Sequence, residues 1–463
     1  MFAALPGTTL HGAGFAAQAV AAGASAILTD PAGAELIGPT DCQVLVVDNP
    51  RAELARIAAE LQGHPAEQLN LFGVTGTAGK TSTVALLAAG LMAAGWSVGT
   101  IGTLGTWFNG QALASTTSTP TTPEAPDVQA QLADFVRRGA GAVAMEVSSH
   151  ALVQHRVDHI CFAVAGFTNL GHDHLDFHGD QERYYQAKAT LFDPEHSRQA
   201  VVNLDDPWGR RLADQLTGDG IAVSRVSLER PADYRVTAWR PGPTGLTAID
   251  LATPTGLARF DLAGLGEFAV RNAVLAAAMI DRGGVDLGAA LTGFAHLAIP
   301  GRMQLLDLGP GAPHVVVDFA HLPEEVAAAL ASLPAGRHLV VLGAGGDRDP
   351  TKRQPMGRAA AEGAAVVIVT DDNPRGEDPV AIRRQVTAGA RSAATGASLI
   401  DGGGRRAAIR TALALAGPND WVAILGKGDE RFQEWADYRQ PFHDAQVVTE
   451  EWASLRQSSS ITD

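Results

Sequence analysis

The stretch from Leu69 to Val84, LNLFGVTGTAGKTSTV, constrains the fold more than any other part of this chain. Its apolar first half predicts a buried strand, Gly76 and Gly79 predict a turn, and apolar residues at helical spacing follow from Thr81. A helix N-terminus that follows a glycine-rich turn forms a cradle for phosphate, because its free N–H groups point at the anion. This order of elements predicts a nucleotide-binding α/β domain.

Within this turn, Lys80 can neutralise phosphate charge and the Thr81 hydroxyl can coordinate magnesium. The strict pattern G-x-x-x-x-G-K-[ST] is not met, because Val74 stands where its first glycine would be. The loop is a G-T-x-G-K-T variant instead. A plain glycine turn with an incidental lysine is the alternative, and it leaves the strand and the helix on either side unexplained. We therefore expect ATP and Mg²⁺ as cofactors.

Length, charge and cysteine content narrow the class of protein. A chain of 463 residues is long enough for about three domains. A formal net charge of -15 argues against a nucleic-acid partner or an anionic membrane surface, although local basic clusters can still bind anions. Cys42 and Cys161 are too few for a disulfide framework and lack zinc spacing. The longest apolar run near the start is too short to span a membrane, so we expect a cytoplasmic protein without membrane insertion.

Alternating apolar strands and amphipathic helices divide the chain into three predicted parts. Residues 1–68 are typical of a small α/β unit, residues 69–299 of a parallel sheet covered by helices, and residues 300–463 of a second α/β series. Residues 221–262, which contain several prolines and glycines, are predicted to form an antiparallel appendage of the middle part. The predicted fold class is α/β with a central parallel sheet.

Polar residues follow several predicted strands of the middle part, and ligands bind at the carboxyl ends of parallel strands. Glu146 ends one apolar strand and is placed to hold magnesium directly or through water. His172, His174 and His178 follow the next strand, at a spacing that is not a zinc pattern. Surface or core histidines are the alternative to metal ligands, but the phosphate loop nearby favours a magnesium-linked role for at least one.

The third part offers basic and amide side chains on loops, namely Arg348, Asn373 and Arg375. Arginine binds a carboxylate through two parallel hydrogen bonds, so these loops suit a ligand that carries a carboxylate. Solvated surface arginines are the alternative for each arginine taken alone. The phosphate loop and the polar strand ends together predict magnesium-dependent phosphoryl transfer.

Taken together, these stretches resemble the Mur ligase family. The resemblance runs through almost the whole chain in the family's order, which chance agreement does not explain. It is carried by Gly73–Thr81, Thr121–Pro123, Met145–Arg156, Phe167–Leu170, Asp173–Asp176, Ala187–Lys188, Pro300–Arg302, Asp318–His321, Gly345–Arg348, Asp372–Arg375 and Gly426–Gly428.

The resemblance implies the three-domain Mur ligase architecture. A UDP-binding domain would occupy residues 1–68, a central P-loop ATPase domain residues 69–299, and a Rossmann-like, amino-acid-binding domain residues 300–463. The implied enzyme is a monomeric, ATP-dependent amide ligase of peptidoglycan precursor synthesis, which adds a diamino acid to UDP-MurNAc-L-Ala-D-Glu through an acyl phosphate. A carboxylate is a poor electrophile until it is phosphorylated, and the attack by an amine needs water excluded and charge neutralised.

Residue roles implied by the resemblance fall into groups. The ATP site would comprise Gly76, Thr77, Ala78, Gly79, Lys80, Thr81, Asn272, Arg302 and Asp318, with Asp318 on the ribose. Magnesium would be held by Thr81, Glu146, His174 and carbamylated Lys188, and the catalytic residues would be Lys80, Glu146, His174 and Lys188. The muramoyl-dipeptide would contact Thr121, Thr122, Ser148, Gln154 and Arg156, and the amino acid Arg348, Asn373, Arg375, Gly426 and Glu430. By itself Lys188 would be an ordinary ion-pairing lysine, so its carbamylation rests on the resemblance alone.

The sequence Asp372-Asn-Pro-Arg375 resembles the type of the family that adds diaminopimelate, whose arginine grips the distal carboxylate that lysine and ornithine lack. Asp429 stands where that type usually has histidine, which leaves L-lysine and L-ornithine open. Ala78, Phe319 and Leu322 also depart from the family's usual residues, and we expect Ala78 to have little effect because the backbone forms the cradle.

The family's first strand and its uridine-contacting segment would lie before Met1. We therefore expect either a truncated first domain that binds UDP poorly or a chain start further upstream.

Two other functions compete with the ligase that the resemblance implies. A folylpolyglutamate synthetase-like ligase is disfavoured by the segment Ser148–Arg156, and a non-catalytic nucleotide-binding protein by the joint presence of Lys80, Glu146 and Lys188 with His174.

Overall fold

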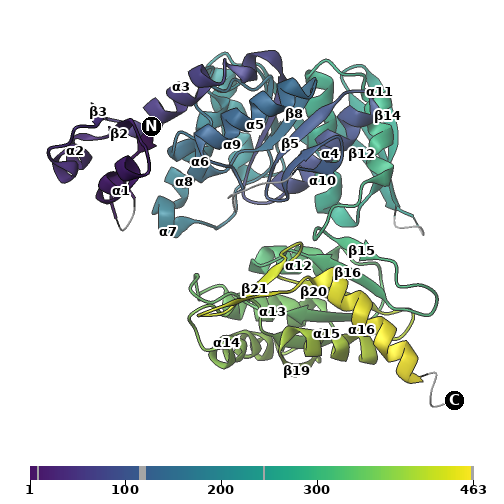
Figure 1. Cartoon of the computed structure of the whole chain (residues 1–463). Helices are drawn as coiled ribbons and strands as arrows, with labels where there is room; N and C mark the ends of the chain where they lie inside the picture. Colours follow the sequence, from purple (N-terminus) through teal and green to yellow (C-terminus); the bar gives the residue numbers. More distant parts are fainter. Residues whose placement is uncertain (8–9, 114–120, 243–245, 460–463) are drawn as a thin grey trace. The chain divides into compact units, whose positions relative to one another are not determined.

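The computed structural model describes residues 1–7, 10–113, 121–242 and 246–459 (Figure 1). The chain forms two compact units. The first comprises residues 1–239, 248–261 and 271–295, and the second comprises residues 240–247, 262–270 and 296–463. Within the described residues, no helix combines the length and the apolar character needed to cross a membrane.

The first unit begins with a small parallel sheet that is separate from the large sheet of the middle of the chain (Figure 1). Its strands are β1 (Phe2–Ala3), β2 (Ala26–Thr29) and β3 (Gln43–Val46), and β2 lies between the other two. Helices α1 (Ala16–Ala21), α2 (Pro31–Ile37) and α3 (Pro50–Leu61) alternate with these strands or follow them. Buried alanine and isoleucine side chains form a separate small core, namely Ala4, Ala13, Ala16 and Ile27.

The middle of the chain is built on one large, mostly parallel sheet. Its described strands lie in the order β14-β13-β12-β11-β10-β9-β4-β8-β5-β6-β7. These strands are β4 (Asn70–Thr75), β5 (Val98–Gly102), β6 (Gly105–Phe108), β7 (Gln111–Ala112), β8 (Ala142–Glu146), β9 (Val164–Phe167), β10 (Ala200–Asn203), β11 (Val223–Ser227), β12 (Tyr234–Pro241), β13 (Leu246–Thr253) and β14 (Gly256–Ala263). Strand β4 pairs in parallel with β8 and β9, so the ends of both neighbours flank the loop that follows β4.

Residues 221–262 extend this sheet, and the prediction of an antiparallel appendage was wrong for β11. Strand β11 pairs in parallel with both β10 and β12, and the order continues through β13 to β14. Proline and glycine mark where a strand ends, but they carry no information about which sheet the next strand joins. The sequence pattern therefore indicated where the turns lie but not which strand β11 pairs with.

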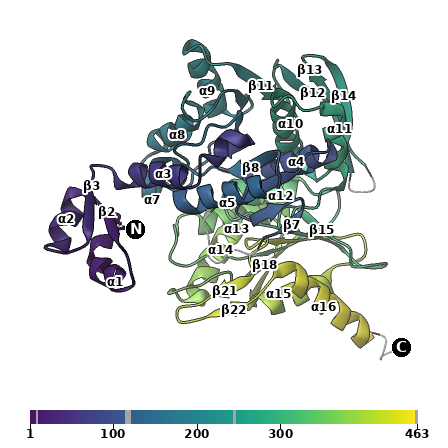
Figure 2. The ribbon, with the colours of Figure 1, turned by 45° about the horizontal axis from the view of Figure 1, so that its top comes forward.

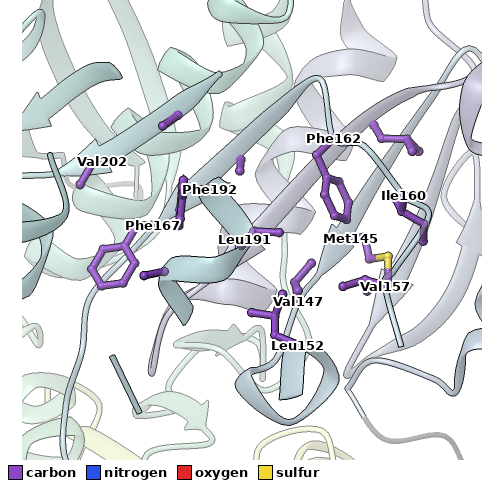
Figure 3. Close-up of a cluster of buried hydrophobic side chains, with 14 of the residues drawn as sticks. Met145, Val147, Leu152, Val157, Ile160, Phe162, Phe167, Leu191, Phe192 and Val202 are labelled. Atoms are coloured by element: carbon purple, nitrogen blue, oxygen red, sulfur yellow. The ribbon is translucent and has the colours of Figure 1, made fainter. Parts of the chain in front are cut away.

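Helices flank this sheet. They are α4 (Lys80–Ala93), α5 (Ala125–Arg137), α6 (Ser149–Val153), α7 (Leu175–His178), α8 (Gln181–Ala189), α9 (Pro207–Gly218), α10 (Gly266–Arg282) and α11 (Leu287–Leu291). The sheet residues Met145 and Phe167 pack with Leu152 and Phe192 in the buried cluster of Figure 3. This core holds β8 and β9 in place, and with them the polar residues at their ends.

The second unit holds a six-stranded sheet in the order β15-β16-β20-β17-β18-β19 within the described residues. The strands are β15 (Gln304–Leu306), β16 (His314–Asp318), β17 (His338–Leu342), β18 (Val366–Thr370), β19 (Ser398–Gly403) and β20 (Trp421–Leu425), and only β15 is antiparallel to its neighbour. The helices are α12 (Pro323–Ala331), α13 (Arg353–Gly363), α14 (Pro379–Ser392), α15 (Arg405–Leu415) and α16 (Asp444–Ser459). A small hairpin, β21 (Phe432–Glu434) and β22 (Arg439–Pro441), follows β20.

Two apolar cores lie on the faces of this second sheet, one with α12, α13 and α14 and the other with α15 and α16. Figures 1 and 2 both show α15 and α16 side by side. Strand β20 lies between β16 and β17, so the chain order reverses where β17 and β20 meet. Ligands of open α/β sheets bind at such a reversal, outside the carboxyl ends of the strands.

Candidate active site

The phosphate loop of the first unit runs from the end of β4 to the start of α4. Gly76 has φ +148° and Gly79 has φ +87°, conformations that a side chain disfavours. A Cβ at Gly76 would lie 1.8 Å from Thr168 Oγ1, and one at Gly79 would lie 2.4 Å from Asn272 Oδ1. Both glycines are therefore required by backbone conformation and by close neighbours.

Neighbouring residues hold the loop by hydrogen bonds to its backbone. Thr77 N donates to Asn169 O at 2.9 Å, and Ala78 N donates to Asn169 Oδ1 at 3.0 Å. The side chain of Thr168, the residue after β9, donates to Ala78 O at 2.7 Å. The loop is fixed by the strand beside it, which is a preorganised arrangement.

Two lysines meet on this loop. Lys80 Nζ donates to Gly76 O at 2.8 Å and to Thr77 O at 2.9 Å. Lys188 Nζ, from α8, also donates to Gly76 O at 2.8 Å and lies 4.4 Å from the ring centre of Tyr184. Burial lowers the pKa of Lys188 well below its ordinary value, and the Lys80 ammonium lowers this pKa further. A lysine whose charged form is disfavoured by burial therefore lies against the phosphate loop.

Glu146 lies at the end of β8, almost fully buried, and one residue fixes its carboxylate. Thr103 N donates to Glu146 Oε1 at 2.8 Å, and Thr103 Oγ1 donates to Glu146 Oε2 at 3.2 Å. The same Thr103 hydroxyl lies 3.1 Å from Thr121 Oγ1. Thr103 thus connects the predicted magnesium ligand Glu146 with the predicted dipeptide ligand Thr121.

The other residues predicted for the muramoyl-dipeptide form one hydrogen-bonded network. Thr122 Oγ1 donates to Glu146 O at 2.9 Å and accepts from Ser148 N at 3.0 Å. Arg156 donates to Thr122 O at 2.7 Å and to Gln154 Oε1 at 2.6 Å, and it pairs with Glu124 at 2.8 Å. The structure therefore brings together the residues that the resemblance grouped.

Two of the histidines predicted near the metal, His174 and His178, lie with His150 in an aromatic cluster around α7. The ring of His150 lies 4.8 Å from that of His174 and 5.6 Å from that of His178. Burial lowers the pKa of His178 to about 4, as do the charges of Lys188 and His174, and His178 Nε2 lies 2.9 Å from Ser149 Oγ. His178 is thus a buried, neutral ring with a local partner, whereas His172 and His174 are exposed.

The predicted ATP residues are divided between the two units. Asn272 lies on α10 against Gly79, in the first unit. Arg302 and Asp318 lie in the second unit, where the Arg302 guanidinium lies 4.4 Å from the ring centre of Phe319. Asp318 accepts from Met303 N at 2.6 Å and from Ala320 N at 2.8 Å, and burial raises the pKa of its carboxyl group.

Most of the residues predicted for the amino acid cluster at the end of β18 and after β20. Asn373 Nδ2 donates to Glu430 Oε2 at 2.8 Å. Arg375 Nε donates to Glu434 Oε2 at 2.9 Å, and its Nη1 donates to Gly346 O at 2.9 Å. Gly426 begins the turn after β20, whereas Arg348 is exposed and donates to Asp347 O at 3.5 Å.

Comparison with known proteins decides the family. The model of the Mur ligase middle domain matches residues 74–280, and the model of the Mur ligase glutamate ligase domain matches residues 301–428. The chain belongs to the Mur ligase family. This Mur ligase is 44% identical over 462 residues to the UDP-N-acetylmuramoyl-L-alanyl-D-glutamate–2,6-diaminopimelate ligase of Streptomyces coelicolor, with 97% of this chain and 89% of that relative covered.

Solved structures agree on the fold. A UDP-N-acetylmuramoyl-L-alanyl-D-glutamate–2,6-diaminopimelate ligase superposes with a TM-score of 0.67 at 30% identity, over 98% of this Mur ligase and 92% of that chain. Folylpolyglutamate synthase of Mycobacterium tuberculosis superposes with a TM-score of 0.65 at 19% identity, over 87% of this chain and 94% of that one, which shows the shared fold alone. The predicted α/β Mur ligase fold and the predicted class of ATP-dependent ligase are confirmed.

Several residues of this Mur ligase lie inside the predicted sites but were missed in the sequence. Thr103 follows β5, a strand whose polar end was overlooked, and Glu124 precedes α5. Lys427 lies within the motif Gly426–Gly428 that carried the resemblance but was given no role, and Glu434 lies on the hairpin after β20. Thr103 could have been found, because a threonine that ends an apolar strand is the same signal that marked Glu146. Glu434 had no such signal, since hairpin β21–β22 was not predicted.

Proposed function

We propose that this Mur ligase joins diaminopimelate to UDP-MurNAc-L-Ala-D-Glu with cleavage of ATP, in the synthesis of the peptidoglycan precursor. The observation that carries this proposal is the relative at 44% identity, whose name states this reaction and of which the chain covers 89%. The chain would act as a cytoplasmic monomer. Its UDP-binding part would lie within residues 1–68, its ATP-binding part within residues 69–299 and its amino-acid-binding part within residues 300–463.

The reaction has two chemical steps. The γ-phosphoryl group of ATP moves to the γ-carboxylate of the substrate's D-glutamate, which gives an acyl phosphate and ADP. The amine of the amino acid then attacks the acyl carbon, and the tetrahedral intermediate collapses with loss of inorganic phosphate. Positioning and charge neutralisation are the main tasks of the protein in such a reaction.

The phosphate loop would serve the first step. Backbone N–H groups of residues 76–81 and the ammonium of Lys80 would hold the β- and γ-phosphates. Lys80 already reaches back over the loop to Gly76 O and Thr77 O, so its charge lies where the phosphates would bind. Asn272 against Gly79 supports the same loop, and Arg302 and Asp318 would contact the rest of the nucleotide.

The donor set fits magnesium. Thr81, Glu146, His174 and a carbamylated Lys188 would hold the ion, which supplies the positive charge that neutralises the phosphoryl group during transfer. The described residues contain no group of three or more His, Cys, Asp and Glu side chains that could hold a metal ion. Magnesium fits this sparse set, since it is usually bound through one or two carboxylates, substrate phosphates and water.

Lys188 is suited to carbamylation because its burial disfavours the charged form of its amine. Only an unprotonated amine attacks CO₂, and full burial beside Lys80 lowers the pKa of Lys188 well below its ordinary value. Carbamylation would replace this amine by an anionic group close to the phosphate loop. An anionic group there would also pair with Lys80, whereas a lysine ammonium would repel it.

The fixed orientation of the Arg375 guanidinium favours diaminopimelate over L-lysine and L-ornithine. Its guanidinium is held at Nε by Glu434 and at Nη1 by Gly346, and these two bonds fix its plane for a ligand carboxylate. Glu430, bound to Asn373, would receive the distal ammonium. A ligand without the distal carboxylate would leave Arg375 without that partner.

The proposal is tested by phosphate release from Mg-ATP and UDP-MurNAc-L-Ala-D-Glu in the presence of meso-diaminopimelate, LL-diaminopimelate, L-lysine or L-ornithine. We expect release with a diaminopimelate isomer and no release by the Lys80→Ala variant. Release with lysine or ornithine alone would refute the choice of amino acid and leave the ligase intact. Retained activity in Lys80→Ala would refute the assignment of the ATP site.

A further inference from the structure

Lys427 is a fully buried lysine in the turn that follows β20. Its side chain is 0% exposed, and its Nζ donates to Glu430 Oε2 at 2.6 Å, to Phe432 O at 2.8 Å and to Asn373 Oδ1 at 3.0 Å. An ammonium has three N–H donors, so each of them has a partner. Two of the three acceptors belong to residues predicted to bind the amino acid.

Lys427 belongs to a charged cluster that consists of Asn373, Arg375, Lys427, Glu430 and Glu434. Asn373 connects its two halves, because its amide accepts from Lys427 Nζ and from Glu434 N at 3.0 Å and donates to Glu430. Arg375 pairs with Glu434 in the other half. The charged cluster contains two cations and two carboxylates, and its charges therefore cancel.

Four further charged groups lie next to this cluster in ion pairs. Arg439 reaches Glu434 from the exposed side at 2.6 Å. On the buried side, Arg405 faces Asp372 at 3.8 Å and pairs with Asp444 at 2.7 Å. Of these four groups, Arg439 and Arg405 are positive and Asp372 and Asp444 are negative.

We propose that Lys427 is a specificity-determining positioning residue, which holds Glu430 and Asn373 in place and keeps the net charge of the charged cluster at zero. This inference rests on the proposed function. The distal end of diaminopimelate carries one ammonium and one carboxylate, and therefore no net charge. The distal end of L-lysine carries an ammonium alone. A cluster without net charge favours the former, and a cluster of net charge −1 favours the latter.

Removal of the Lys427 charge changes this preference in one direction. Glu430 would lose its counter-charge, which would strengthen attraction for an ammonium and repel a distal carboxylate. Asn373 and Glu430 would also lose the donor that fixes their positions, which weakens a ligand that must meet both Arg375 and Glu430 at once. Both effects lower the preference for diaminopimelate over lysine.

The test compares kcat/KM for diaminopimelate with kcat/KM for L-lysine in the full chain and in its variants. In Lys427→Met we expect the ratio of the two values to fall about tenfold or more. Lys427→Arg keeps the positive charge and should stay near the wild-type ratio. Lys352→Met, a partly exposed lysine just before α13, serves as the control with the same chemical change and should leave the ratio unchanged.

The outcomes separate this inference from the proposed function. A wild-type chain that releases no phosphate with any amino acid refutes the proposed function, and the inference falls with it. A wild-type chain that uses diaminopimelate, together with a folded Lys427→Met variant of unchanged ratio, refutes the inference alone. If Lys427→Met shows no thermal unfolding transition, Lys427→Gln takes its place. Loss of folding in both would make Lys427 a scaffold residue and overturn the proposal.

Discussion

At the scale of single residues, Thr103 is the connection between the predicted phosphoryl-transfer site and the predicted dipeptide site. Its hydroxyl reaches both Glu146 and Thr121, so Thr103→Val removes two hydrogen bonds and preserves the side chain's shape. We expect kcat to fall about tenfold, as is common when a group that orients a metal ligand is lost. Steady-state phosphate release at saturating substrates measures this effect.

The matched control for Thr103→Val is Thr106→Val. The Thr106 hydroxyl donates to Gln131 Oε1 at 3.2 Å, outside the predicted site, and its loss should change stability by about 1 kcal/mol and kcat very little. An equal fall in kcat in both variants would contradict a specific role of Thr103.

Lys188 gives a second prediction at this scale, through the dependence of stability on pH. Its folded pKa is lowered, so the unfolded chain binds one more proton than the folded chain between that lowered pKa and the ordinary pKa near 10.5. The free energy of unfolding therefore rises with pH in this window, by about 1.4 kcal/mol per pH unit for a full proton. In Lys188→Met this contribution disappears, and phosphate release should also disappear.

Urea unfolding at pH 7 and pH 9 in CO₂-free buffer measures the slope. The buffer must lack CO₂, because carbamylation would change the titrating group. Parallel slopes for the wild type and Lys188→Met would show that Lys188 is charged in the folded chain, which would remove the physical basis for its carbamylation.

At the scale of elements, the phosphate loop depends on the strand beside it. Gly76→Ala would drive a Cβ into Oγ1 of Thr168, the residue after β9, in a conformation with φ +148°. We expect loss of ATP binding, measured by isothermal titration calorimetry. Gly95→Ala is the control, because Gly95 also has positive φ, +86°, but a Cβ there meets nothing within 4 Å. In that variant only the backbone strain should lower the free energy of unfolding, by about 1–2 kcal/mol, and ATP should still bind.

The same elements show what a sequence can and cannot reveal. Strand β4 and helix α4 were predictable, because Leu71 and Phe72 belong to a short apolar run and the buried Val84 and Leu87 recur at helical spacing. The pairing of strands was not predictable, because the hydrogen bonds that join β11 to β10 and β12 are made by backbone groups that every sequence has. Likewise, the residue type of Arg375 indicated a carboxylate ligand, but its pairing with Glu434 depends on a hairpin with no clear apolar alternation.

At the scale of the whole molecule, the two compact units have separate apolar cores and should unfold in separate steps. A substitution at Arg405 should lower the midpoint of one unfolding transition without changing the other. In the second unit, its fully buried guanidinium donates twice to Asp444 at 2.7 Å and once to Leu425 O at 2.9 Å. Arg405→Met would leave the Asp444 carboxylate buried without its partner, which typically costs about 3–5 kcal/mol.

Differential scanning calorimetry should therefore resolve two transitions, of which Arg405→Met lowers one and Gly76→Ala the other. Arg406→Met is the matched control on the same helix, because Arg406 is 51% exposed in its pairs with Glu450 and Glu451. Exposed pairs contribute about 0–1 kcal/mol, so this variant should leave both midpoints nearly unchanged. A single transition, or an equal shift of both transitions in Arg405→Met, would mean that the units fold as one cooperative body. In that case the unit that holds the charged cluster after β20 and the unit that holds the phosphate loop after β4 would have one common free energy of unfolding. A destabilising variant in either unit would then destabilise both.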